Sequence, residues 1–86
     1  MPTISRFYGI LIRMYFGDHH PPHFHAVYGE HEAVIGIEDL AILRGELPSR
    51  ALALATEWAR IHRAELQEEW MRAQQRRPLR PISPLE

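Results

Sequence analysis

Five of the six histidines lie close together, within residues 19–31 of a chain of 86 residues. The densest stretch reads DHHPPHFHA over residues 18–26. Imidazole binds divalent metal ions and also serves as a general acid or base near neutral pH. This segment is therefore where we expect chemistry, and the surrounding elements must position its side chains.

His23 and His25 are separated by one residue, so in a strand their side chains point the same way, with Cα atoms about 6.6 Å apart. That spacing allows both rings to bind one ion. The two prolines before them have a fixed φ, which restrains the preceding aspartate and histidine. The chain has no cysteine, so its donors are imidazole and carboxylate, which suit zinc, nickel, iron or manganese, and the expected cofactor is a divalent metal such as zinc or nickel. The candidate metal ligands are Asp18, His19, His23, His25 and Glu32.

Two other interpretations of the same residues stay open. The histidines can form a structural cluster, in which neutral rings donate to backbone carbonyls and pack beside Tyr15 and Phe24. Alternatively, His23 and His25 are the candidate catalytic acid and base of a metal-independent ribonuclease, with Arg13 or Tyr15 holding a phosphate. The residues alone do not choose between a metal site, a catalytic pair and a structural cluster, and they leave open whether the protein is an enzyme.

The elements that must position these side chains begin with strands. Residues 4–16 are rich in β-branched and aromatic types, and their alternation predicts one strand, bent at Gly9. One face of this strand would consist of Ile4, Arg6, Tyr8, Ile10, Ile12, Met14 and Phe16. Residues 23–37 predict a hairpin, because Gly29-Glu30 suits a two-residue type II′ turn. Pairing Tyr28 with His31 then creates one apolar face, made by Phe24, Ala26, Ala33, Ile35 and Ile37. His23, His25 and Glu32 fall on the opposite face.

Helical periodicity follows a predicted loop over residues 38–47. Pro48 is a favourable first helical residue, and the apolar positions Ala51, Leu54, Ala55, Trp58 and Ile61 recur at intervals of three and four. The stripe loses its phase near His62, which predicts either one long kinked helix or two shorter helices ending near residue 77.

The last nine residues, PLRPISPLE, repeat a proline followed by an apolar residue. A polyproline II helix has three residues per turn, so Leu79, Ile82 and Leu85 share one edge, which we expect to dock on this domain or on a second copy. The fold class predicted is α+β: a three-stranded antiparallel meander, then the helix or helices, then a proline-rich tail. Residues 1–77 form the single domain and residues 78–86 the docking tail.

Composition limits the remaining classes of function. Hydrophobic residues make up 45% of the chain, and the net charge of −1 disfavours a uniformly basic nucleic-acid binder. The basic residues Arg72, Arg76, Arg77 and Arg80 follow a predicted helix end, where cations favour the macrodipole, so a solvated helix end is favoured there over a nucleic-acid site. The longest apolar runs are too short to cross a bilayer and the N-terminus does not look like a signal peptide, so we expect a cytoplasmic protein without a membrane partner.

A wider pattern runs through three segments of the chain: MPTISRFYGI, IRMYFGDHHPPHFHAVYGEHEAVIGIEDL, and GELPSRALALATEWARIHRAEL with a tryptophan following. In these segments the chain closely resembles the small bacterial family known as domain of unknown function 4160. The family has no established activity, and its members resemble components of toxin–antitoxin modules. The resemblance therefore implies a protein partner encoded nearby, and it assigns no catalytic residue. The positions it carries over are those of the central block, Asp18, His19, Pro21, Pro22, His23, Phe24 and His25.

Two functions follow as hypotheses. The first is an interaction module of a toxin–antitoxin-like pair, with homodimerisation through the tail as an additional expectation. The second is a metal-dependent or acid–base hydrolase of RNA or a nucleotide, centred on His23 and His25 with Asp18 and His19 in support. The apolar edge of the tail favours the first, and the density of histidines favours the second.

Overall fold

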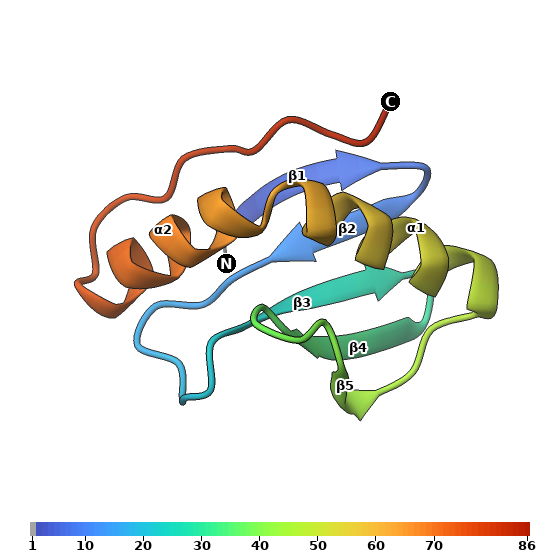
Figure 1. Cartoon of the computed structure of the whole chain (residues 1–86), viewed down its shortest axis with the longest axis horizontal. Coiled ribbons are helices and arrows are strands. Elements are labelled where there is room, and N and C mark those ends of the chain that lie inside the picture. The colour runs from blue at the N-terminus through green and yellow to red at the C-terminus, as the bar shows by residue number, and fades with distance from the viewer. Residues whose placement is uncertain (1) are drawn as a thin grey trace.

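The computed structural model describes residues 2–86 and shows an antiparallel sheet of five strands covered by two helices (Figure 1). Each strand pairs with its neighbour in sequence, so the sheet is a meander in the order β1-β2-β3-β4-β5. The elements in chain order are β1 (Thr3–Phe7), β2 (Ile10–Arg13), β3 (His23–Tyr28), β4 (His31–Gly36), β5 (Ile42–Gly45), α1 (Ser49–Ile61) and α2 (Arg63–Gln74). The α+β class and the antiparallel meander are confirmed, whereas the expected number of three strands is wrong.

The first extra strand arises because residues 4–16 fold back on themselves. Tyr8 and Gly9 adopt φ angles of 48° and 79°, and positive φ at both central residues is the backbone of a type I′ turn. Tyrosine is rare at such a position, so the sequence contains no strong turn signal there.

The predicted face of this segment is confirmed at four buried positions, Ile4, Ile10, Ile12 and Met14, and is wrong at its other three. A bulge between Thr3 and Ser5 interrupts the simple alternation. The bulge shifts the alternation, so Ile4 and Phe7 are both buried although they are three residues apart. Arg6 lies exposed on the other side. Tyr8 and Phe16, which the simple alternation also placed on the apolar face, are 56% and 41% exposed.

The second extra strand is β5, in the segment expected to be a loop. It pairs with β4 at the edge of the sheet, with Val34 opposite Arg44. All four of its residues are exposed, so no buried alternation marks them as a strand. Backbone pairing with β4, rather than a buried side-chain pattern, forms this element.

The central hairpin follows the expected register. Tyr28 lies opposite His31, Ala26 opposite Ala33, and Phe24 opposite Ile35. The predicted apolar face is confirmed, because every member is fully buried: Phe24, Ala26, Ala33, Ile35 and Ile37.

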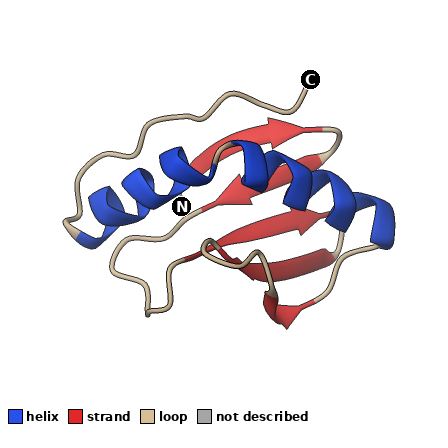
Figure 2. Cartoon of the chain, viewed as in Figure 1, coloured by secondary structure: helices blue, strands red, loops and turns tan. Residues whose placement is uncertain are grey.

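Both helices lie across one face of the sheet (Figure 2), and the apolar core lies between them and the sheet. By strand alternation, His23 and His25 project from the other face. The chain breaks between α1 and α2 at His62, which confirms the version with two shorter helices. Trp58 anchors α1, with its ring 5.4 Å from Phe7 and 6.0 Å from Phe24. Ile61 is 59% exposed, so its predicted place in the stripe is wrong: the stripe ends one turn earlier. Within residues 2–86, no helix has the length and apolar character needed to cross a membrane.

Residues 78–86 run back across the domain (Figure 1). The backbone N–H of Ile82 donates to the carbonyl oxygen of Ile4 over 2.7 Å, and the indole N–H of Trp58 donates to the carbonyl oxygen of Ser83 over 2.8 Å. Ile82 is buried, while Leu79 and Leu85 are partly buried against the core. The apolar edge of the tail therefore packs on its own chain.

Candidate metal site

His23 and His25 occupy alternate positions of β3 and project from the face opposite the apolar core. His23 is the first residue of the strand, where Trp70 of α2 still reaches its ring. Their side chains are only 9% and 8% exposed. The ring of Tyr15 meets the ring of His25 edge to face at 4.5 Å, and the indole of Trp70 lies 5.1 Å from the ring of His23. These aromatic contacts restrict the two imidazole rings to one arrangement.

Asp18 comes from the loop between β2 and β3, and α2 holds this loop in place. The backbone N–H of Gly17 donates to the carbonyl oxygen of Ala73 over 3.2 Å. The amide of Gln74 donates to the carbonyl oxygen of Asp18 over 3.0 Å. Both contacts join residues far apart in sequence, so the position of Asp18 depends on the packing of the C-terminal helix.

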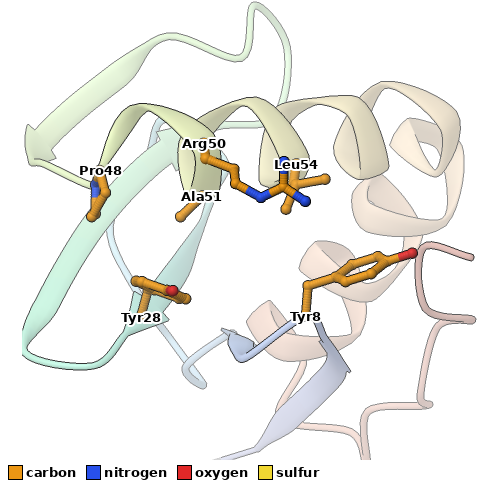
Figure 3. A pocket seen from close by; sticks show the side chains of 6 residues that line it. All are labelled: Tyr8, Tyr28, Pro48, Arg50, Ala51 and Leu54. Carbon is orange, nitrogen blue, oxygen red and sulfur yellow. The ribbon is translucent and has the colours of Figure 1, made fainter.

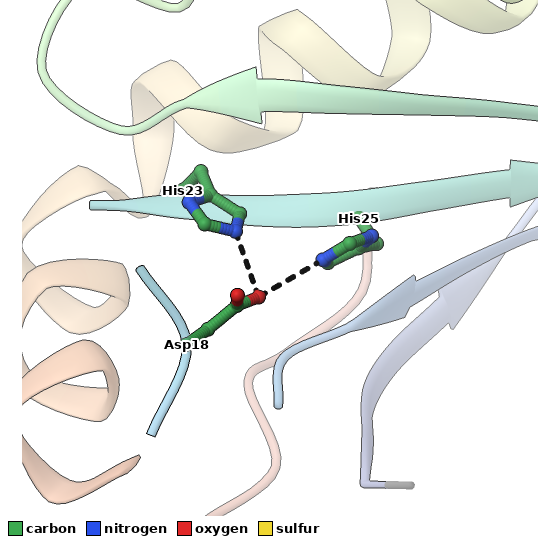
Figure 4. Close-up of side chains that lie close together, drawn as sticks. All are labelled: Asp18, His23 and His25. Atoms are coloured by element: carbon green, nitrogen blue, oxygen red, sulfur yellow. Dashed lines mark hydrogen bonds and ion pairs between the residues drawn. The ribbon is translucent and has the colours of Figure 1, made fainter. Parts of the chain in front are cut away.

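One carboxylate oxygen of Asp18 faces both histidines (Figure 4). Its Oδ2 atom lies 2.8 Å from Nε2 of His23 and 3.3 Å from Nε2 of His25. One donor atom from each of the three side chains lies within 4.8 Å of the other two. We refer to Asp18, His23 and His25 as the triad.

The outer nitrogen of each ring also faces an oxygen. Nδ1 of His23 lies 2.8 Å from the carbonyl oxygen of Pro21, and Nδ1 of His25 lies 2.9 Å from Oε2 of Glu32. A carbonyl oxygen only accepts, so Nδ1 of His23 carries a proton, and in a neutral ring Nε2 then presents a lone pair. All four ring nitrogens therefore have oxygen partners, although a neutral imidazole has only one N–H to donate.

Two states satisfy this arrangement. In the first, both rings are imidazolium ions paired with Asp18 and Glu32. The ring centres are 5.3 Å apart, so the two positive charges repel each other by about 3 kcal/mol at an effective dielectric of 20. The two carboxylates must offset this repulsion. In the second, both rings are neutral and one cation lies between the two Nε2 atoms and Asp18.

Both of these states need an ionised carboxylate at Asp18. Burial alone raises the pKa of this carboxyl, but hydrogen bonds from the backbone N–H of His19 and from the rings of His23 and His25 outweigh burial and keep the pKa below its ordinary value of 3.8. Asp18 is therefore ionised at neutral pH, as a metal-ligating carboxylate must be.

The other residues singled out from the sequence lie around the triad rather than within it. Glu32 contacts the outer nitrogen of His25 and is half exposed. His19 is exposed, and its backbone N–H donates to Oδ1 of Asp18. Arg13 lies opposite His25 on β2, and its Nε is buried without a hydrogen-bond partner in residues 2–86.

Several residues that shape the site escaped the sequence pattern. Trp70 and Gln74 belong to α2, some fifty residues along the chain from the histidines, and no local spacing connects them. Arg44 belongs to β5 and lines a pocket of about 210 Å³ beside the triad. The remaining lining residues of this pocket are Asp18, His19, His20, Pro21, His23, Val34 and Leu43.

A second pocket lies between the N-terminal end of α1 and the β1–β2 and β3–β4 turns (Figure 3). It is lined by Tyr8, Tyr28, Pro48, Arg50, Ala51 and Leu54. This lining contains neither a histidine nor a carboxylate, so the chemistry of metal binding belongs to the pocket beside the triad.

Comparison with known proteins identifies the class of this α+β domain. Residues 9–71 match the family described as Domain of unknown function (DUF4160). The match covers most of the chain, including the triad, Glu32 and Arg44, and the protein belongs to this family. No curated protein and no solved structure matches the chain.

Proposed function

We propose that the protein binds one divalent metal ion through Nε2 of His23, Nε2 of His25 and a carboxylate oxygen of Asp18. The observation that carries the proposal is that the outer nitrogens of both rings already have oxygen partners. Metal-bound histidines in proteins almost always donate their second N–H to a carbonyl or a carboxylate. Pro21 and Glu32 supply these two acceptors at 2.8 and 2.9 Å.

The number and type of ligands favour a reactive ion over a structural one. Structural zinc sites use four protein ligands, whereas catalytic sites use three and leave a position for water. Two histidines and one carboxylate with open positions also suit iron(II). The pocket reaches Asp18 and His23, so solvent and small molecules have access to the ion.

Such a centre supports hydrolysis. A bound divalent ion lowers the pKa of its water to about 7, which supplies hydroxide at neutral pH. We therefore propose a metal-dependent hydrolase as the activity. In this proposal the Nε2 atoms of His23 and His25 bind the metal ion. The same nitrogens would have to transfer protons in a metal-independent acid–base mechanism, so we favour the metal-dependent hydrolase.

The test is metal content of the untagged protein, followed by calorimetric titration with zinc and nickel. We expect one ion per chain, bound at micromolar concentration or tighter in the wild type and lost in the His23→Ala/His25→Ala variant. His31→Ala, which removes an exposed histidine from the same hairpin, serves as the matched control and should bind normally. Failure of the wild type to bind either metal would leave the paired imidazolium state and overturn the proposal.

A second candidate function is an interaction module with a small protein encoded nearby, as in a toxin–antitoxin-like pair. The observation that favours it is the open edge of the sheet at β5, where Ile42 and Leu43 are 41% and 46% exposed. An unpaired edge strand offers N–H and C=O groups to an added strand. We propose the cytoplasm as the location for either function, on the sequence alone.

This second function is tested by co-expressing the protein with the product of the neighbouring gene. Leu43→Pro removes a backbone donor from the edge strand and should abolish the complex while zinc binding persists. Pro84→Ala, at an exposed position of the tail, is the control. A complex that survives the Leu43→Pro change would exclude β5 as the docking edge.

A further inference from the structure

The pocket beside the triad contains one cationic side chain, Arg44. It comes from β5, at the edge of the sheet, while Asp18 and His23 line the same pocket from the β2–β3 loop and β3. Val34 and Leu43 supply an apolar wall. A positive group thus lies at the same pocket as two of the three proposed metal ligands.

The register of the sheet places a second arginine in the same row. Arg13, His25, Val34 and Arg44 lie opposite one another across β2, β3, β4 and β5. Directly opposite residues of antiparallel strands project from the same face. His25 therefore lies between two arginines on the face that the helices leave uncovered.

Neither arginine is neutralised by the part of the chain that the structure describes. No ion pair involves Arg13 or Arg44 within residues 2–86, and the Nε of Arg13 is buried without a hydrogen-bond partner. A buried donor without a partner is costly, and native structures rarely retain one without a reason. Arg13 does not line the pocket beside the triad, so it adds positive charge to this face without a direct contact in that pocket.

Charge decides which anion fits. A divalent ion and two arginines, set against the carboxylates of Asp18 and Glu32, leave about two positive charges at the site. A carboxylate carries one negative charge, whereas a phosphate monoester carries about 1.5 to 2 at neutral pH. Arginine also matches the oxygens of phosphate through paired N–H donors.

Size restricts what the phosphate is attached to. Pockets that enclose drug-sized ligands measure about 300 to 1,000 Å³. The pocket beside the triad measures about 210 Å³, which is smaller than this range. It suits a phosphoryl group with a small ester substituent better than a nucleobase.

We propose that this pocket binds the phosphoryl group of a small phosphate monoester, with one oxygen at the open position of the metal ion and Arg44 donating to the others. Arg13 contributes a second positive charge from the other side of His25. The inference rests on the proposed metal site, because the ion supplies half of the positive charge. Hydrolysis there would transfer the phosphoryl group to water: the ester P–O bond breaks, a P–O bond to the water oxygen forms, and the alcohol leaves with a proton.

The experiment is calorimetric titration of the zinc-loaded full chain with inorganic phosphate and, separately, with acetate. Arg44→Gln should bind zinc as the wild type does and bind phosphate about tenfold or more weakly, since it loses charge-assisted hydrogen bonds. Arg60→Gln, an exposed arginine on α1, is the matched control and should change neither affinity. Arg13→Lys keeps the positive charge, which is all that Arg13 contributes, and should bind phosphate about as the wild type does.

The outcomes separate the two proposals. Absence of zinc binding in the wild type would overturn the metal site and the phosphate site together. Normal zinc binding with equal phosphate affinity in Arg44→Gln and Arg60→Gln would overturn the phosphate site and leave the metal site standing. Acetate bound as tightly as phosphate would overturn the preference for a dianion.

Discussion

At the scale of single residues, the outer partners of the two rings decide what the triad can bind. Pro21 holds the proton on Nδ1 of His23, and Glu32 does the same for His25. In the proposed metal-bound state both rings are neutral, and each directs the lone pair of Nε2 towards the ion that Asp18 also binds. Glu32 is one of the ligands expected from the sequence, and in the structure its carboxylate contacts the outer nitrogen of His25.

Glu32→Gln tests this role of Glu32. Glutamine retains an acceptor but loses the charge that makes the ring of His25 a stronger ligand, so we expect zinc affinity to fall about 10- to 100-fold. Thermal unfolding of the metal-free protein should hardly change, because the side chain of Glu32 is half exposed. Glu30→Gln at the exposed turn is the control, and equal zinc affinities in the two variants would contradict the role.

Asp18→Asn tests the electrostatics of the metal-free site. The pKa of Asp18 in the folded protein lies below its ordinary value of 3.8. Ionised Asp18 therefore stabilises the fold at pH values above 3.8, and this contribution disappears as the pH falls through the pKa of the folded state. We expect wild type to exceed Asp18→Asn in free energy of unfolding at about pH 6, with the gap closing towards about pH 3. Urea titrations across this pH range measure the difference in free energy of unfolding. A difference that is independent of pH would contradict the hydrogen bonds that Asp18 accepts from His19, His23 and His25.

At the scale of elements, β5 matters because it carries Arg44 to the pocket without burying any of its own residues. Its attachment depends on the backbone ladder with β4 and on Gly45, which has a φ of 78°. A Cβ atom on Gly45 would lie 2.1 Å from the carbonyl oxygen of Glu32. Only glycine allows the two strands to approach this closely.

Gly45→Ala should therefore separate β5 from β4. Positive φ costs a non-glycine residue about 1 to 2 kcal/mol, and the collision with backbone adds to that cost. Gly29→Ala is a matched control, because Gly29 also has a positive φ of 58° but nothing lies within 4 Å of an added Cβ. We expect the thermal midpoint to fall further in Gly45→Ala, measured by circular dichroism; equal midpoints would show that β5 tolerates displacement.

At the scale of the whole molecule, the C-terminal third of the chain positions the site and closes the core. The helix α2 holds the loop of Asp18 through Ala73 and Gln74. The tail adds a backbone hydrogen bond to Ile4 and an acceptor for the indole of Trp58, and its Arg80 pairs with the buried Glu69. A domain of this size has a small reserve of stability, so such contacts count.

Deletion of residues 78–86 should lower the thermal midpoint by several degrees. It exposes the core around Ile4 and Trp58 and leaves Glu69 buried without its partner. Sedimentation of the same variant tests the expected homodimer: a tail that docks only on its own chain leaves the oligomeric state unchanged. An unchanged midpoint would contradict the docking that the contacts describe.

Local patterns account for the parts of the fold that were predicted. The register of the central hairpin followed from a glycine turn and from alternation that places Phe24 and Ile35 on one face. The break at His62 followed from the loss of helical phase. The β1–β2 turn at Tyr8 was missed because tyrosine gives no turn signal, and β5 was missed because backbone pairing alone forms it.

The sequence by itself determined that His23 and His25 share one face of a strand, because side chains alternate in any strand whatever packs around it. It also determined that Asp18 lies in a loop nearby, because glycine and the two prolines interrupt the strand pattern there. Only the tertiary structure decided that one oxygen of Asp18 faces both rings, that Pro21 and Glu32 take the outer nitrogens, and that Arg44 lies at the pocket. These contacts depend on how α2 packs on the loop and β5 on the sheet, and such long-range packing leaves no trace in local spacing.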